Sequence, residues 1–167
     1  DIILISHSHY DHFSLNDIRK ITMPETDILI TPDSQSKLHD VEGKITLVEP
    51  GKKYSIKNLV IETTPSYNTN KKFHPKENNW VGYIFSLNGI KIYHAGDTDF
   101  IPEMRELRKL NLDVAVLPIG GTYTMNVDEA IEAANEIAAK TTIPMHYRRL
   151  LGGSYKTAEE KFLAGVT

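Results

Sequence analysis

Short apolar runs alternate with polar turns through the first half of the chain. The runs are rich in β-branched residues, and each predicts a strand: residues 1–6, 27–31, 45–48, 54–56, 59–64, 81–87 and 90–94. Lys57-Asn58 and Asn88-Gly89 each separate two neighbouring runs, and Asn-Gly is the strongest short signal for a hairpin. The pattern therefore predicts a strand-rich first half with two hairpins, and short helices at 17–21 and 34–39.

The second half alternates between strands and helices. Pro102 opens a predicted helix that runs to residue 109, and an apolar run predicts a buried strand at 113–117. Strand 141–144 comes next, and a capping box at 157–160 begins a last helix that stops near Gly165. The clearest helix is predicted at 128–140, because apolar residues recur there at helical spacing: Ala130, Ile131, Ala134, Ile137 and Ala138. This alternation favours an α/β fold with sheets inside and helices outside.

Composition narrows the classes of function. The chain has 167 residues, 40% of them hydrophobic, which suits one domain covering residues 1–167. A net charge of -3 gives no broad electropositive surface for nucleic acid or an anionic membrane. No apolar run approaches the ~20 residues of a membrane helix and no signal peptide is recognisable, so we expect a cytoplasmic protein. The absence of cysteine leaves histidine and carboxylate as the ligands for a transition metal.

A dense group of ligand-type side chains follows the first predicted strand. In an extended segment, residues two apart project from the same face, so His7 and His9 can present their imidazoles to one point. If the chain then turns toward a helix, Asp11 and His12 reach a neighbouring point, where a second ion fits. A solvated polar turn is the alternative, but packing these groups together without a partner is costly. We therefore predict a metal site here.

Other candidates are weak when taken alone. Asp97 and His146 each follow a predicted strand, and such residues are commonly turn, packing or surface residues. His94 precedes the Gly96-Asp97 turn and is expected to orient the carboxylate rather than bind metal. His39 lies in a polar stretch and is expected to be solvated.

These segments together resemble a known family. His7-Ser8-His9-Tyr10-Asp11-His12 is similar to the H-x-H-x-D-H signature of the metallo-β-lactamase superfamily, and the segments 93–98 and 144–147 resemble its later ligand motifs in the right order. The segments 80–83 and 118–125 resemble a branch of small metal-dependent hydrolases related to ascorbate-phosphate lactonases. The resemblance implies an αββα sandwich of two mixed sheets with helices on the outer faces.

The same resemblance implies roles for individual residues. By this likeness His7 and His9 hold a first metal, Asp11, His12 and His146 hold a second, and Asp97 bridges them.

The chain departs from the family pattern in two places. The family's third histidine of the first site is absent after the strand at 59–64, and His74 is the nearest replacement, as a ligand, a substrate contact or a surface residue. Several strands usually precede the histidine motif, so we expect the chain to lack the usual N-terminal strands.

The resemblance implies a metal-dependent hydrolase acting on an ester, lactone or phosphodiester of a small molecule. A metal ion lowers the pKa of bound water from ~15.7 to about 7, which supplies hydroxide, and Asp11 and His12 are the expected catalytic residues. One or two zinc ions are expected, with manganese or iron as alternatives. No membrane partner is expected, and a homo-oligomer is compatible with the sequence.

Two other functions remain open at this point. A nuclease is disfavoured because the pairs Lys52-Lys53 and Lys71-Lys72 are sparse for holding RNA or DNA. A non-catalytic metal-binding domain is the other alternative.

Overall fold

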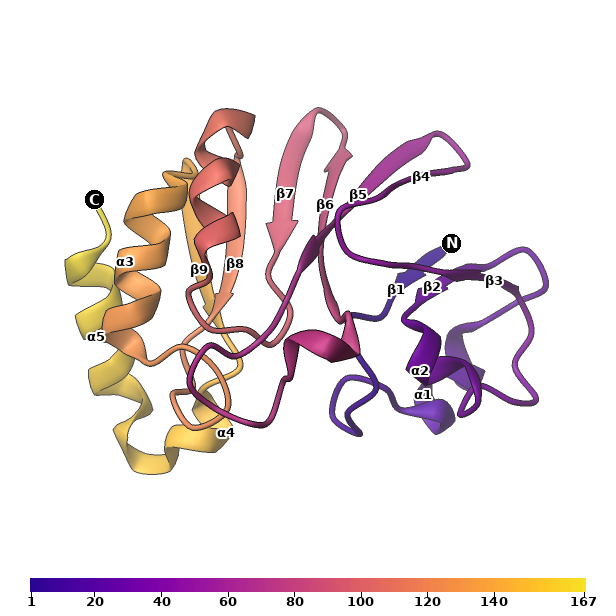
Figure 1. Cartoon of the computed structure of the whole chain (residues 1–167), viewed down its shortest axis with the longest axis horizontal. Helices are drawn as coiled ribbons and strands as arrows, with labels where there is room; N and C mark the ends of the chain where they lie inside the picture. The colour runs from indigo at the N-terminus through magenta and orange to yellow at the C-terminus, as the bar shows by residue number, and fades with distance from the viewer.

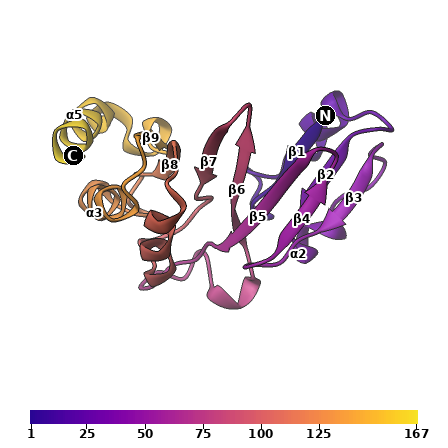
Figure 2. The ribbon, with the colours of Figure 1, turned by 90° about the horizontal axis from the view of Figure 1, so that it is seen from above.

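Two β-sheets pack against each other between helices in the computed structural model, which describes all 167 residues (Figures 1 and 2). The strands are β1 Ile2–Leu4, β2 Asp27–Ile30, β3 Lys44–Leu47, β4 Lys53–Ile56, β5 Leu59–Pro65, β6 Val81–Leu87, β7 Ile90–His94, β8 Val114–Pro118 and β9 Thr141–Met145. The α-helices are α1 Leu15–Ile21, α2 Pro32–Gln35, α3 Val127–Ile137, α4 Arg148–Leu151 and α5 Tyr155–Gly165. Short 3₁₀ helices are η1 Lys76–Asn78, η2 Pro102–Leu110 and η3 Gly152–Ser154.

The connections between strands explain the topology. One sheet has the order β1-β2-β3 and the other β4-β5-β6-β7-β8-β9. The hairpins β4-β5 and β6-β7 are antiparallel, as predicted, and Lys57, Asn88 and Gly89 adopt the positive φ angles that their tight turns require. The pairs β7-β8 and β8-β9 are parallel, because η2 and α3 carry the chain back between them. Two mixed sheets were expected, but both strand pairs of the smaller sheet are parallel.

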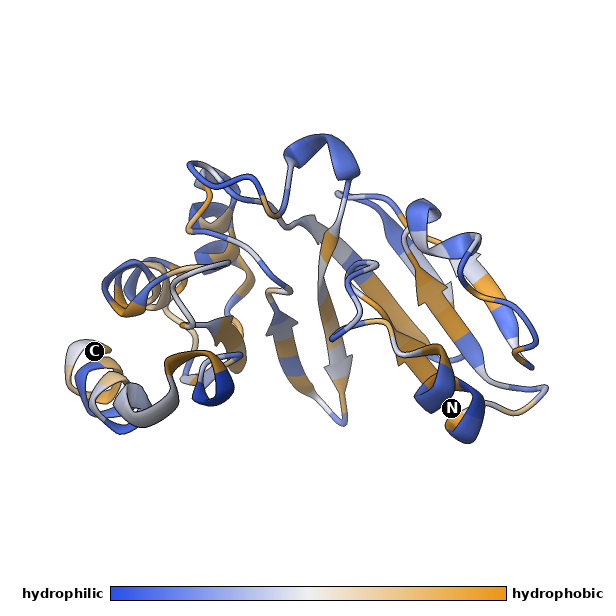
Figure 3. Ribbon diagram, turned by 90° about the horizontal axis from the view of Figure 1, so that it is seen from below, coloured by the Kyte–Doolittle hydropathy of each residue, from blue (hydrophilic) through white to orange (hydrophobic).

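Three apolar clusters hold the layers together. The first lies between the larger sheet and η2, α3 and α5, with Tyr93, Leu117 and Phe162 almost fully buried. The second packs α1 on the smaller sheet through Ile18. The third lies between the two sheets, around Leu29, and Figure 3 shows hydrophobic residues concentrated along these strands. Helix, sheet, sheet and helix therefore form four successive layers.

Several boundaries differ from the prediction. Helix α3 ends at Ile137 rather than at residue 140, because Ala138 adopts a left-handed conformation with φ 52° and is exposed. Ala133 is buried in the apolar stripe where Ala138 was expected. The capping box predicted at 157–160 is wrong: α5 already begins at Tyr155, directly after η3. Helix α5 packs against α3 and α4, and helix α4 was not predicted.

The topology brings several strand ends to one region. The segment 7–12 follows β1, Asp97 follows β7, His146 follows β9, and His74 lies in the loop between β5 and β6. No helix in the structure combines the length and the apolar character needed to cross a bilayer.

Candidate metal centre

All seven residues proposed as ligands come together between the two sheets. Their ligand atoms form three overlapping groups, and the atoms of each group lie within 4.8 Å of one another. The groups are His7 with His9 and His74, His7 with His12 and Asp97, and Asp11 with His12 and His146. The second group shares His7 with the first and His12 with the third, and we call the first and third groups the first and second candidate centres.

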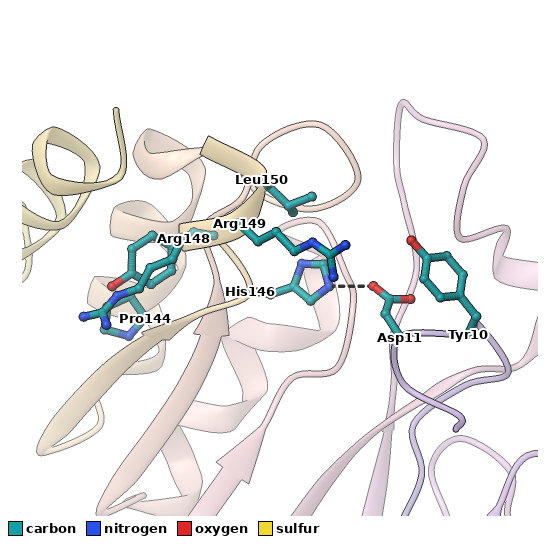
Figure 4. Close-up of a pocket in the computed structure, with 8 residues that line it drawn as sticks. Tyr10, Asp11, Pro144, His146, Arg148, Arg149 and Leu150 are labelled. Carbon is teal, nitrogen blue, oxygen red and sulfur yellow. Dashed lines mark hydrogen bonds and ion pairs between the residues drawn. The ribbon is translucent and has the colours of Figure 1, made fainter. Parts of the chain in front are cut away.

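Asp97 lies at the junction of the two centres. Its Oδ2 is 3.4 Å from Nε2 of His74 on one side, and 3.4 Å and 3.6 Å from Nε2 of His12 and His146 on the other. At the mouth, Oδ2 of Asp11 is 3.2 Å from Nε2 of His146 (Figure 4). One carboxylate oxygen thus faces imidazole nitrogens that come from three separate parts of the chain.

Four buried ligand-type atoms have no hydrogen-bond partner. They are Nε2 of His12, Nε2 of His74, Oδ1 of Asp97 and Nδ1 of His146. Buried polar atoms in folded proteins are almost always paired, so several unpaired ones within a single cluster require an explanation. A cation held by Nε2 of His12, Nε2 of His74 and the Asp97 carboxylate satisfies three of these four atoms, and the donor set of histidine and aspartate suits a transition metal. The residues therefore fit a metal ion.

Burial and mutual repulsion favour neutral imidazoles at the first centre. Burial, with a contribution from the charge of His12, lowers the pKa of His7 from 6.5 to about 2. Burial and His74 also lower the pKa of His9. A histidine must be deprotonated to coordinate metal, so these two rings are in the binding form at neutral pH.

Asp97 is held in its charged form, in contrast to the neutral His7 and His9. Burial by itself would raise the pKa of Asp97, but the contacts of its Oδ2 with Nε2 of His12 and His74, both at 3.4 Å, hold this pKa well below its usual range. The same contact raises the pKa of His12, although burial opposes this rise. A proton on His12 and a metal ion compete for the same nitrogen, so metal binding is expected to release a proton.

A second set of residues holds His74 in place. Its Nδ1 lies 3.2 Å from Oδ1 of Asn68 and 3.1 Å from the carbonyl oxygen of Tyr123, both of which accept hydrogen bonds. The proton therefore sits on Nδ1 and leaves the lone pair of Nε2 directed at Asp97. Asn68 is itself held by Asp99, which is 2% exposed and accepts from its amide nitrogen at 3.1 Å.

The sequence analysis missed this supporting set. Asp99 stands two residues after Asp97, which was a usable signal, whereas nothing in the polar stretch singled out Asn68. His94 does not contact the carboxylate directly: its Nδ1 accepts from the backbone N–H of Gly96 at 3.2 Å, which fixes the turn that carries Asp97. Gly96 has φ 67°, and a Cβ there would meet the carbonyl oxygen of Val81 at 2.9 Å. His39 is exposed, as expected.

A cavity of about 270 Å³ opens onto the centre. Its lining includes His9, Asp11, His74, Asp97 and His146 together with the apolar or aromatic side chains of Tyr10, Phe73, Tyr123 and Leu150. The indole of Trp80 does not line this cavity: it packs against the rings of His7, His9 and His74, with centroids 4.8, 4.7 and 5.4 Å apart. Tyr67 and Tyr147 are buried.

Known proteins resemble this chain over most of its length. Residues 1–146 match the family model described as the beta-lactamase superfamily domain. The chain is 34% identical over 149 residues to a UPF0173 metal-dependent hydrolase of Thermoplasma acidophilum, an alignment that covers 88% of this chain and 65% of that protein. It is 32% identical over 171 residues to one from Pyrococcus abyssi, covering 99% of this chain and 74% of that protein. The chain thus spans slightly less than two thirds of the Thermoplasma relative.

Solved structures show the same architecture. A Parabacteroides distasonis protein assigned as a metal-dependent hydrolase is 34% identical and superposes with a TM-score of 0.83, covering 99% of this chain and 73% of its own. A metallo hydrolase of Ignicoccus hospitalis is 25% identical, with a TM-score of 0.76, covering 98% of this chain and 72% of its own. The expected sandwich fold is confirmed.

Proposed function

The chain belongs to the β-lactamase superfamily and, within it, to the family of UPF0173 metal-dependent hydrolases, and from this membership we propose that it hydrolyses an ester, lactone or phosphodiester of a small molecule. The fold alone does not select a substrate, because one fold supports many reactions. The proposal therefore depends on the site.

We propose that two divalent ions bind here. His7, His9 and His74 hold the first, Asp11, His12 and His146 hold the second, and Asp97 contacts both. Zinc suits these donors, with manganese and iron as alternatives. When bound, such ions act as Lewis acids on the substrate and lower the pKa of water to about 7.

The observation that carries the proposal is the position of Asp97. Its Oδ2 lies 3.4 Å from Nε2 of both His12 and His74, so it faces the two centres at once. Its depressed pKa keeps this carboxylate ionised at neutral pH, which supplies the negative charge that two neighbouring cations need. His12 belongs both to the group that contains Asp97 and to the group of the second centre, so it links Asp97 to that centre.

Asp11 performs the proton transfer in this proposal. Its side chain is 40% exposed at the mouth of the cavity, while Oδ2 is fixed 3.2 Å from His146. A carboxylate placed between solvent and the reacting centre can orient an incoming water molecule and accept its proton. The side chains of Phe73 and Leu150 give the cavity an apolar side.

Metal analysis and turnover test the proposal together. The protein is stripped with chelator, reloaded separately with zinc, manganese or iron, and assayed on a phenyl ester, a lactone and bis(4-nitrophenyl) phosphate. We expect up to two ions per chain, and turnover that is abolished in Asp97→Ala and His12→Ala with the fold retained. His39→Ala, which removes an exposed imidazole, is the matched control.

Each outcome decides between the candidate functions. An unchanged rate in Asp97→Ala would remove this residue from the mechanism. Bound metal without turnover of any substrate would favour a non-catalytic domain. Salt-dependent retention on single-stranded RNA, with cleavage, would favour a nuclease.

A further inference from the structure

A second hollow lies beside the candidate metal centre. It has a volume of about 560 Å³ and is lined mainly by the segment around β9 and α4. It shares four lining residues with the smaller cavity over the ligands: Tyr10, Asp11, His146 and Leu150. The two hollows therefore adjoin, and a molecule bound at the metal centre has room to extend into the larger one.

Two consecutive arginines line this larger hollow but differ in their partners. Nη2 of Arg148 donates to Oε1 of Glu159 at 2.9 Å, and its guanidinium lies 5.6 Å from the ring of Tyr155. Arg149 makes no hydrogen bond or ion pair with any residue of the chain. Figure 4 shows its side chain extended past the His146 ring toward Asp11, while Arg148 points the other way. Arg149 is thus the one unpaired guanidinium facing the centre.

We propose that Arg149 is a specificity-determining residue that binds an anionic group of the substrate, a phosphate or a carboxylate. The inference rests on the proposed hydrolase function and adds the class of substrate. A guanidinium presents a planar fork of N–H donors that matches both kinds of oxyanion, and such charge-assisted bonds are about twice as strong as neutral ones.

The remaining walls indicate the rest of the substrate. Phe73 and Tyr123 pack edge to face with centroids 4.7 Å apart, and with Leu150 they form an apolar side of the smaller cavity. Each of these three side chains is more than a third exposed, so an occupant would cover apolar surface that now faces water. These walls suit a small ester, lactone or phosphodiester that carries both an anionic group and an apolar portion.

Binding of matched probes tests the role of Arg149 separately from turnover. Benzylphosphonate and phenylacetate carry the two candidate anions, and dimethyl benzylphosphonate and methyl phenylacetate are the uncharged counterparts. Dissociation constants for the metal-loaded protein are measured by calorimetry for wild type, Arg149→Gln, Arg149→Lys and the charge-matched control Arg148→Gln. We expect Arg149→Gln to lower the affinity for one or both anions by about tenfold or more. The affinity of Arg149→Lys should lie between those of wild type and Arg149→Gln. The methyl esters, and every probe in Arg148→Gln, should change less than twofold.

The outcomes separate the two proposals. The anion whose affinity falls more in Arg149→Gln carries the group that Arg149 prefers. Unchanged anion affinity in Arg149→Gln, or an equal loss in Arg148→Gln, overturns the inference even where wild type hydrolyses the ester panel. An Arg149-dependent anion affinity in a protein that hydrolyses nothing supports the binding role and refutes the hydrolase instead. Thermal unfolding of each variant shows that any loss arises in the folded state.

Discussion

Replacing Asp99 with Asn tests whether a buried ion pair holds the loop that carries His74. The Asp99 carboxylate accepts from Nζ of Lys71 at 2.7 Å, from the backbone N–H of Thr69 at 2.9 Å, and from Asn68. Asp99→Asn keeps the shape of the side chain but leaves the Lys71 ammonium, whose side chain is 19% exposed, without its carboxylate.

The expected cost follows from this burial. Removing one partner of a fully buried pair costs about 3–5 kcal/mol. Lys71 retains some solvent and lies 4.0 Å from Glu129, so we expect about 2–3 kcal/mol for Asp99→Asn. At roughly 2–4 °C per kcal/mol for a chain of this size, the melting temperature should fall by about 4–12 °C. Because Asn68 and Thr69 then lose a charged acceptor, the loop that carries His74 is held less firmly, and affinity for the metal should drop by about 10- to 100-fold.

Denaturant unfolding and metal titration measure the two effects. The double variant Lys71→Met/Asp99→Asn removes the unpaired ammonium, so it should be more stable than Asp99→Asn alone, with a coupling energy of about 1–3 kcal/mol. A loss below about 0.5 kcal/mol in Asp99→Asn, or an equal loss in the Lys71→Met background, would refute the reasoning.

Three further predictions follow from the site and its surroundings. His74→Ala should lower the metal content from two ions to one, measured by elemental analysis. Gly120→Ala should weaken metal binding at the second centre, because a Cβ there would lie 2.4 Å from the carbonyl oxygen of His146. Partial burial alone would raise the pKa of Asp33, but hydrogen bonds from Trp80 and two hydroxyls hold this pKa below its usual 3.8. The ionised carboxylate therefore stabilises the fold above pH 3.8, and this stabilisation is lost as the pH falls through the pKa of Asp33 in the folded protein. Asp33→Asn should make stability less dependent on pH in this range, which acid unfolding monitored by Trp80 fluorescence measures.

Control variants sharpen these tests. His39→Ala should keep both ions, since this ring is exposed and belongs to none of the ligand groups. Gly153→Ala should leave metal binding unchanged, because nothing lies within 4 Å of the added Cβ. Equal metal content in His74→Ala and wild type would remove His74 from the ligand set, and unaltered acid unfolding in Asp33→Asn would show that this carboxylate is not coupled to folding.

Local signals in the sequence were sufficient for the hairpins and the strand ends. The turn at Asn88-Gly89 depends only on the conformations available to those two residues, and the observed strands β6 and β7 match the prediction. The grouping of His7 and His9 on one face likewise follows from strand geometry, which has a period of two. Helix α3 was found from its apolar spacing, but its end at Ile137 was not, because that end depends on the left-handed conformation of Ala138, which apolar spacing does not reveal.

The sequence by itself determined that the chain carries a metal-type ligand set on an α/β framework, because ligand chemistry and strand periodicity are local properties. Only the tertiary structure decided that His74 lies beside His7 and His9, since a loop anchored by Asp99 carries it there from 67 positions along the chain (74 less 7). It also decided which of two adjacent arginines is free, because Glu159 lies within reach of Arg148 and Arg149 has no partner. Contacts between distant segments depend on how the layers pack, and no short stretch of residues contains that information.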